Sequence, residues 1–270
     1  MAAAAAEPDV DALRTPTLDA EGQGLLNRIS EEGGYAFVNM ASLAASGDFR
    51  AAEAARDMAW EQLHSAPWHS VLPAWRDAYS MACLHVAKHH YSRGDIREAL
   101  RTLDMGVIMG GSLLRKDLDS SIHSLSSKVT CRGVPEECGD GFTKTGRLLV
   151  HGDFNVLEVF RVLPPKSLTC KLVDKRHSPS VEGFLLDFLL PGTPVIISDC
   201  MTHWPARAKW NDVNYLERVA GYRTVPVEVG KNYLCTDWKQ ELITFSEFLE
   251  RIQSNNLIPE PTYLAQHPLF

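Results

Sequence analysis

A histidine and an aspartate separated by one residue, His151 and Asp153, follow the apolar stretch LLV. This spacing supplies two of the three ligands of the facial triad that holds non-haem Fe(II) in oxygenases and leaves coordination positions open for oxygen and a co-substrate. So short a motif recurs by chance, and a polar turn after an apolar strand accounts for it more simply. By itself the motif does not establish an iron site.

A second candidate pair, His85 and His89, is spaced so that both side chains lie on one face of a helix. The glutamate of a His-Glu-x-x-His metal motif is replaced by Val86, and no third ligand is evident. We interpret this pair as histidines on a helix surface. The sequence also lacks a Gly-x-x-x-x-Gly-Lys-Ser/Thr nucleotide loop and a Gly-x-Ser-x-Gly nucleophile elbow.

The composition is that of a globular protein. Of the 270 residues 45% are hydrophobic and 23% charged, and the formal net charge is −7. This acidic balance argues against direct nucleic-acid binding, which needs a basic face. The six cysteines are scattered without a Cys-x-x-Cys pair, which indicates free thiols in a reducing compartment. With no apolar run of membrane length and no signal-peptide pattern, we expect a soluble intracellular protein without a membrane partner.

The first half of the chain has a helical pattern. We expect residues 1–17 to form a disordered Ala-rich tail and residues 18–128 a helical domain. One apolar stripe follows a helical period, with Asp95 as N-cap and Gly110-Gly111 as the stop. Its residues are Ile96, Leu100, Leu103 and Val107. A second stripe, ending at Gly94, consists of Leu72, Trp75, Tyr79, Ala82 and Val86.

This helical region contains a faint internal repeat. GDFRAAEAARDMAW (47–60) and GDIREALRTLDMGV (94–107) align without gaps and share several residues at an offset of 47. Such an offset is typical of helical-hairpin units, which stack into solenoids because a single unit does not bury its apolar face. Two copies are few for a solenoid, so we favour a compact bundle of antiparallel helices.

After a Gly- and Pro-rich linker, 129–165, the pattern becomes mixed α/β. TPVIIS (193–198) is typical of a buried strand. TVPVEVG (224–230) alternates, with the valines on one face and Pro226 and Glu228 on the other. A short helix stopped by Gly221 lies between these strands. Thr244 and Glu247 form a capping box that predicts a further helix.

The stretch FLLPGTPVIISDCMTHWPARAKWNDVNYLERVAGYRTVPVEVG, followed by YLAQHPLF, resembles the opening of a JmjC catalytic domain. The resemblance is to the lysine-specific demethylase 8 type in its plant-like form, and it covers 166–270. DMGVIMGG, near the end of the helical region, is similar to the N-terminal domain of the same group. The implied fold class is α+β. An N-terminal all-α, repeat-like domain is followed by the N-terminal part of a JmjC (cupin-like) double-stranded β-helix.

This resemblance implies an activity. Members of the group are Fe(II)- and 2-oxoglutarate-dependent dioxygenases acting on protein side chains, as histone lysine demethylases or arginyl hydroxylases. The implied partners are histones or other nuclear proteins. The implied setting is the nucleus, with the cytoplasm as a second location, and transcription, chromatin and circadian regulation.

The same resemblance bears on the iron question. In this family the iron-binding His-x-Asp and the second histidine follow the YLAQHPLF strand, whereas His151 and Asp153 precede the first strand of the domain. The chain ends at Phe270, where those strands would begin. We therefore expect an incomplete, truncated JmjC domain (166–270) with no metal ligand, no catalytic residue and no bound cofactor.

Four residues match the wall of the family's active site. Tyr263 matches the tyrosine that contacts the 2-oxoglutarate carboxylate, although a core aromatic explains it equally. Glu228 matches a glutamate that lines the substrate pocket, where a carboxylate suits a guanidinium or ammonium group; the alternative is a solvated strand charge. Tyr233 and Trp238 match aromatics at the pocket rim, or plain core residues. Two neighbours of Tyr263 are interpreted as structural: Gln266 and His267.

Two hypotheses of function remain open for the chain. One is the dioxygenase of the family, inactive in this chain as given. The other is a non-catalytic helical interaction module from a truncated or spliced product. Because the rest of the barrel would be missing, we also expect the apolar faces of residues 195–197 and of the valines in 224–230 to lack most of their opposing sheet. Residues 166–270 would then fold loosely.

Overall fold

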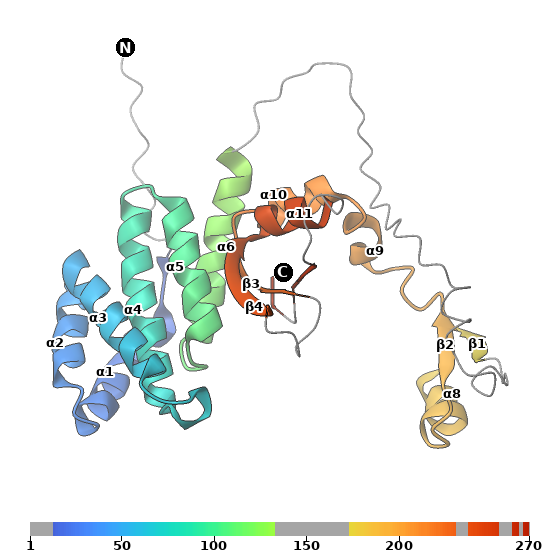
Figure 1. The fold of residues 1–270 in the computed structure, drawn as a ribbon, viewed down its shortest axis with the longest axis horizontal. Coiled ribbons are helices and arrows are strands. Elements are labelled where there is room, and N and C mark those ends of the chain that lie inside the picture. Colours follow the sequence, from blue (N-terminus) through green and yellow to red (C-terminus); the bar gives the residue numbers. More distant parts are fainter. Residues whose placement is uncertain (1–12, 133–172, 231–236, 254–260, 265–266, 270) are drawn as a thin grey trace, which may run out of the picture. The chain divides into compact units, whose positions relative to one another are not determined.

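The computed structural model describes residues 13–132, 173–230, 237–253, 261–264 and 267–269 (Figure 1). Contacts divide the chain into two compact units, Met1–Gly139 with Glu217–Phe270, and Asp140–Leu216. The first unit contains a set of helices and a three-stranded sheet. The second contains a two-stranded parallel sheet.

The helical part of the first unit is arranged around α4, which packs against α3 and α5. Most of its side chains are buried, and many are alanines, which allow neighbouring helices to approach closely. An edge-to-face contact between Phe37 and Trp75, 5.6 Å between ring centroids, joins α2 to this core. The helices are α1 (Pro16–Glu31), α2 (Tyr35–Ala45), α3 (Phe49–His64), α4 (Pro73–Ser92), α5 (Ile96–Met109) and α6 (Arg115–Arg132), with a 3-10 turn at Trp68–Ser70.

Both predicted apolar stripes are confirmed, with one error. In α5 the residues Leu100, Leu103 and Val107 are buried. In α4 the stripe is buried from Trp75 onward, but Leu72 is 45% exposed. The helix begins at Pro73, so Leu72 precedes the first turn and does not share its buried face.

The internal repeat has a structural basis. Gly47 and Gly94 both adopt a left-handed backbone, with φ of +99° and +79°, just after a helix ends. Asp48 and Asp95 follow them, and each side chain accepts a hydrogen bond from the backbone N–H three residues later, at 3.1 and 3.3 Å. The repeated Gly-Asp pair therefore ends one helix and caps the next.

The glycines at the end of α5 are required by close packing. A Cβ on Gly110 would lie 2.0 Å from Ser80 Oγ, and a Cβ on Gly111 would lie 2.0 Å from Asp77 Oδ1. Asp77 also accepts a hydrogen bond from the Leu113 amide at 3.1 Å. The helix ends here as predicted, because the chain turns directly against α4.

Polar contacts join the N-terminus of α1 to α6 and to α4. The buried carboxylate of Asp117 on α6 accepts hydrogen bonds from the backbone N–H groups of Thr17 and Leu18, at 3.2 and 2.7 Å. Lys88 Nζ donates to Thr15 Oγ1 at 2.6 Å. The N-terminus of α1 is thus capped by a residue far along the chain.

The three-stranded sheet of the first unit has the order β4-β3-β5, and both pairings are antiparallel. The predicted alternation of β3 is confirmed, since Val225, Val227 and Val229 are buried while Pro226 and Glu228 are partly exposed. The strands are β3 (Thr224–Val229), β4 (Lys239–Thr244) and β5 (Thr262–Tyr263).

The helices next to this sheet begin and end as predicted. α10 (Val213–Ala220) stops at Gly221. α11 (Phe245–Gln253) is capped by Thr244, whose hydroxyl accepts a hydrogen bond from the Glu247 N–H at 3.2 Å. The helices α5 and α11 contact β3. The expectation that the valine face would lack cover is therefore wrong, because helices bury it.

The strands of the second unit are more exposed than β3 of the first unit. β1 (Asp174–His177) and β2 (Val195–Ser198) pair in parallel, connected through α8 (Val181–Phe184) and a π-helical turn, Leu185–Leu189. A short helix, α9 (Pro205–Lys209), follows. Ile196 and Ile197 are 52% and 36% exposed, so the strand is not buried as its apolar run predicted. This exposure agrees with the second expectation, that residues 195–197 lack most of an opposing sheet.

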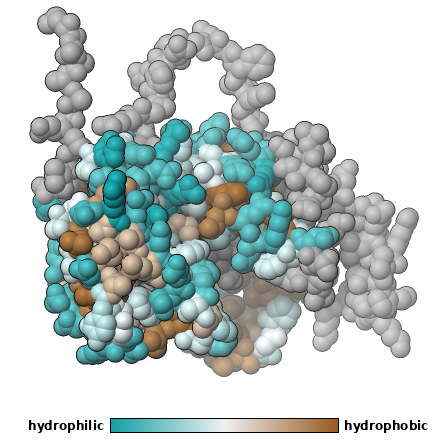
Figure 2. All heavy atoms as spheres, turned by 60° about the vertical axis from the view of Figure 1, so that its left-hand side comes forward, coloured by the Kyte–Doolittle hydropathy of each residue, from teal (hydrophilic) through white to brown (hydrophobic). Residues whose placement is uncertain are grey.

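The helical face that Figure 2 turns toward the viewer has no uniform polarity. Figure 2 shows hydrophilic and hydrophobic residues intermingled on the helical face turned toward the viewer. Among the helices of the described ranges, none combines the length and the apolar character that crossing a membrane requires.

Candidate functional site

One face of the three-stranded sheet carries two of the four site residues proposed from the sequence, Glu228 and Tyr263. Glu228 on β3 lies directly opposite Tyr263 on β5 and Gln240 on β4. Directly opposed residues of antiparallel strands point to the same face, with Cβ atoms about 4.5–5.5 Å apart. We name this face, formed by Pro226, Glu228, Gln240, Leu242 and Tyr263, the Glu228 face. Glu228 and Tyr263, distant in sequence, are neighbours on it.

The Glu228 face is open, in contrast to the valine face behind it. Tyr263 is 59% exposed and Leu242 is 49% exposed. The tyrosine hydroxyl can donate a hydrogen bond to a carboxylate, and the glutamate carboxylate can accept several from a guanidinium or ammonium group. The arrangement can therefore bind a ligand anion and a ligand cation side by side.

Trp238 lies close to one end of this face. Gly230 follows β3 with φ of +137°, and a Cβ on it would lie 3.0 Å from the Cα of Trp238. Glycine thus allows the backbone before β4 to approach the end of β3. Trp238 is partly buried and stands two residues before Gln240. The proposed rim residue Tyr233 lies outside the described residues.

Of the two residues near Tyr263 that were interpreted as structural, the structure describes only His267. Gln266 lies outside the described residues. Burial lowers the pKa of His267 to about 4, and the charges of Arg223 and Arg115 lower it further. The imidazole is therefore neutral, and its buried Nε2 has no hydrogen-bond partner among the described residues.

The start of β3 is held by a buried ion pair. Asp104 on α5 is fully buried, and its carboxylate accepts hydrogen bonds from Arg223 Nε and from the Thr224 N–H, both at 2.7 Å. Arg223 also donates to the carbonyl oxygen of Leu269 at 3.0 Å. Burial raises the pKa of Asp104, and Arg223 and the Thr224 amide oppose this rise.

This ion pair was not predicted from the sequence, although the sequence contains a signal for it. Asp104 stands four residues after Leu100 and next to Leu103, so it lies on the buried stripe of α5. A charged residue at such a position needs a buried partner. Through this pair the helical domain fixes the strand that carries Glu228.

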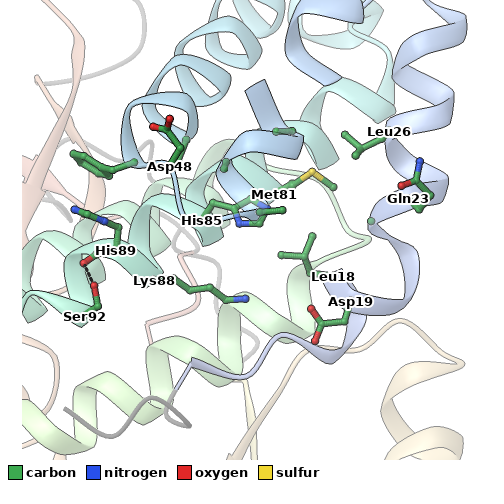
Figure 3. Close-up of a pocket in the computed structure, with 17 residues that line it drawn as sticks. Leu18, Asp19, Gln23, Leu26, Asp48, Met81, His85, Lys88, His89 and Ser92 are labelled. Atoms are coloured by element: carbon green, nitrogen blue, oxygen red, sulfur yellow. Dashed lines mark hydrogen bonds between the residues drawn. The ribbon is translucent and has the colours of Figure 1, made fainter. Parts of the chain in front are cut away.

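A separate cavity of about 530 Å³ lies within the helical domain (Figure 3). Both His85 and His89 line it and are partly buried, where the sequence predicted histidines on a helix surface. Burial lowers the pKa of His85 to about 4, with a further contribution from the Lys88 charge. Figure 3 shows Lys88 extending toward Leu18 and Asp19. His89 stacks on Phe49 with 4.0 Å between ring centroids.

The residues that the structure describes contain no group of three or more His, Cys, Asp or Glu side chains placed to hold a metal ion. His151 and Asp153 lie outside those residues.

Comparison with known families defines the class of protein. Residues 15–137 match the family model described as KDM8-like, N-terminal ARM repeats, and residues 181–268 match the cupin-like domain. The chain is thus an α+β protein in which helical ARM-like repeats precede part of a cupin-like domain. The ARM match favours the solenoid interpretation of the internal repeat over the compact bundle.

Individual relatives narrow this class. The chain is 62% identical to lysine-specific demethylase JMJ30 of Arabidopsis thaliana, with 96% of this chain aligned to 63% of the relative. It is 35% identical to lysine-specific demethylase 8 of Danio rerio, with 79% aligned to 52%. Jumonji C domain-containing protein 5 of Drosophila melanogaster is 28% identical, with 86% aligned to 56%. The chain belongs to the JmjC proteins of the lysine-specific demethylase 8 type. It spans between about half and two thirds of the length of these relatives.

Proposed function

We propose that this chain supplies the helical domain and the substrate-facing wall of a JmjC dioxygenase that uses Fe(II) and 2-oxoglutarate. Its substrates would be basic side chains of proteins, in histones or other nuclear proteins. The observation that carries the proposal is the direct pairing of Glu228 with Tyr263 on an open sheet face. Membership of the family supports the reaction class, and two of the relatives are named lysine-specific demethylases.

Glu228 is the residue proposed to bind the target side chain. Its carboxylate would accept charge-assisted hydrogen bonds from an arginine guanidinium or a lysine ammonium group. Trp238, at the end of the same hairpin, would border the pocket and contact the aliphatic part of that side chain. Tyr233 is proposed as a second rim residue.

Tyr263 is the residue proposed to bind 2-oxoglutarate. Its exposed ring carries a hydroxyl that fits a carboxylate as a hydrogen-bond donor, so the residue suits the co-substrate. When bound, iron and 2-oxoglutarate would supply the oxidising chemistry. The role of the described residues is to hold the target carbon near that centre and to orient the co-substrate.

The location and biological setting are proposed on the same basis. We place the protein in the nucleus, with the cytoplasm as a second location, in transcription, chromatin and circadian regulation. The partner is a protein substrate rather than a nucleic acid.

The test of this function is peptide oxidation by the product of the complete transcript. If the reading frame continues past Phe270, that product should consume 2-oxoglutarate with methyl-lysine or arginine peptides. Loss of a methyl group would identify demethylation, and gain of one oxygen atom would identify hydroxylation. Glu228→Gln should raise KM for the peptide and Tyr263→Phe should raise KM for 2-oxoglutarate. The matched control Glu250→Gln, an exposed glutamate on α11, should change neither. Unchanged KM values in both site variants would refute the assignment.

The 270-residue chain by itself is expected neither to consume 2-oxoglutarate nor to bind Fe(II) tightly. Likewise, His151→Ala should leave metal affinity and thermal stability unchanged. Turnover of 2-oxoglutarate above a metal-free blank, or loss of bound iron in the variant, would contradict this expectation and reinstate His151 and Asp153 as a site.

A non-catalytic interaction module is the second candidate. The cavity within the helical domain, lined by partly buried polar side chains, favours it, because repeat domains commonly present concave surfaces to peptides. A helical domain that captures a nuclear protein equally well with Glu228→Gln in the chain would support this alternative.

A further inference from the structure

A cleft of about 1000 Å³ lies within the first unit, between the helical domain and the three-stranded sheet. Three consecutive residues of β4, Leu242, Ile243 and Thr244, line it. Successive side chains of a strand point to opposite faces. Three residues in a row therefore reach one cleft only where the cleft runs along the edge of the strand.

β4 has a free edge in the described sheet. The strand order is β4-β3-β5, so among the described strands β4 pairs with β3 alone. The backbone N–H and C=O groups on the other side of an edge strand are a template for an additional extended segment. Strand addition of this kind is a common mode of peptide recognition, in which the backbone provides affinity and the side chains provide selectivity.

The walls of the cleft offer apolar contact. Trp60 from α3, Tyr222 from the turn before β3 and Leu242 from β4 line it and are 37%, 43% and 49% exposed. Aromatic side chains at such positions give large contact areas at a small cost in conformational entropy. A peptide along β4 would therefore meet apolar side chains in the cleft.

Among the described residues, one arginine of the cleft, Arg97, is not paired with a carboxylate. Arg56 pairs with Asp57 at 3.2 Å, and Arg101 approaches Glu98 at 3.8 Å. Arg97 instead stacks on Tyr222, 4.4 Å from the ring centroid, and donates to its hydroxyl at 3.0 Å. Within the described residues Arg97 forms no ion pair, so its guanidinium is available to an acidic ligand group.

We propose that the edge of β4 binds, as an added strand, the segment of the protein substrate that flanks the target side chain, and that Arg97 binds an acidic residue of this segment. The inference rests on the proposed function, because it takes the substrate to be a protein with a basic target residue. It assigns part of substrate recognition to the helical domain, through Trp60 and Arg97.

The sheet register sets the spacing that this substrate needs. A peptide residue beside Gln240 would lie two strand spacings, about 10 Å, from Glu228, which a long lysine or arginine side chain on the same face can largely bridge. From Gln240 to Thr244 is about 13 Å along the strand, and Arg97 lies near Tyr222 past that end. The acidic residue is therefore expected about five or six positions from the basic one.

Fluorescence anisotropy with labelled synthetic peptides and the 270-residue chain tests this. The probe peptide carries arginine, an apolar residue in the middle and glutamate about five positions away, made in both sequence directions. Replacing its glutamate by glutamine, or Arg97→Gln in the protein, should each weaken binding about tenfold, the size of a charge-assisted hydrogen bond, and the two changes together should be no worse than either. N-methylation of alternate peptide nitrogens should abolish binding for one of the two registers.

The matched control is Arg50→Gln, which removes the same charge from an exposed position on α3 outside the cleft. It should leave the affinity unchanged. Equal weakening by Arg50→Gln and Arg97→Gln would mean non-specific attraction and would overturn the inference. So would binding that is insensitive to N-methylation, or association of the chain with itself along this edge in light scattering.

The assay needs neither iron nor turnover, so its failure is distinct from failure of the proposed function. If Glu228→Gln weakens peptide binding while Arg97→Gln does not, the Glu228 face stands and the cleft assignment falls. If Arg97→Gln weakens binding but the complete product oxidises no peptide, the cleft stands and the dioxygenase assignment falls.

Discussion

The strands β2 and β3 contain similar residues and have opposite surroundings. β3 alternates valine with other residues, and all three of its valines are buried. β2 is a continuous apolar run, yet Ile196 and Ile197 are exposed. Apolar composition therefore does not decide whether a strand is buried. The packing of helices against one face of β3 does.

This difference assigns a structural role to the helical domain. α5 contacts β3, and Asp104 on that helix binds both the arginine before the strand and the first amide of the strand. No ion pair of this buried kind involves β2 in the described part of the chain. We conclude that the helical domain stabilises the strand that carries Glu228.

The largest expected effect is that of breaking this ion pair. Asp104→Ala leaves Arg223 buried without its carboxylate partner, which typically costs about 3–5 kcal/mol of unfolding free energy. Chemical denaturation monitored by far-UV circular dichroism measures this cost. The control Arg115→Ala removes a surface pair with Asp119 and should cost less than about 1 kcal/mol. Equal effects of the two substitutions would show that Asp104 does not anchor the strand.

A smaller effect on stability is expected from shortening one side chain in β3 and one in β2. Val227→Ala removes fully buried methyl groups and should cost about 2–3 kcal/mol. Ile196→Ala acts on a half-exposed side chain and should change stability by no more than about 0.5 kcal/mol. Denaturation midpoints of the two variants decide this. A loss at Ile196 as large as that at Val227 would remove the contrast between the strands.

The smallest predicted effect is a pH dependence of stability that originates in the helical domain, at His85. The folded-state pKa of His85 is about 4 against an ordinary value of 6.5, so the unfolded chain binds a proton that the folded chain does not in this range. Stability should fall as pH drops from 6.5 to 4, by about 2 kcal/mol after allowance for partial exposure. His89, Lys88 and Asp19 lie in the same cavity, and the pKa of His89 is also lowered.

Thermal unfolding of the protein and of His85→Gln across this pH range measures the contribution of His85 to the pH dependence of stability. The substitution should flatten the pH dependence, and His89→Gln should flatten it less. An unchanged slope in His85→Gln would mean that the imidazole titrates normally in the folded protein.

Local patterns in the sequence correctly predicted those features of the fold that depend on neighbouring residues. The cap at Asp95, the stop at Gly221 and the Thr244 capping hydrogen bond each depend on residues within one helical turn. The alternation of β3 predicted which face is buried, because strand geometry has a period of two. The family resemblance implied that Glu228 and Tyr263 both belong to the wall of the active site. The periodicity of the sequence alone does not predict this.

The remaining features depend on contacts between distant residues. Asp104 meets Arg223 across 119 residues, and Asp117 caps α1 across about 100, distances at which a single sequence carries no pairing signal. The prediction that β2 is buried was wrong for the same reason, because burial depends on what packs against a strand. Only the charge of Asp104 within an apolar stripe indicated that a partner exists.

Hydrogen–deuterium exchange of β2 and β3 measures whether the helical domain stabilises the strand that carries Glu228. The amides of Val225 to Val229 should exchange nearly as slowly as those of α5, and Asp104→Ala should accelerate them while leaving α3 unchanged. The amides of Val195 to Ile197 should exchange much faster in both proteins. If Val195 to Ile197 exchange as slowly as the helices, or if β3 stays protected in Asp104→Ala, the helical domain does not stabilise β3.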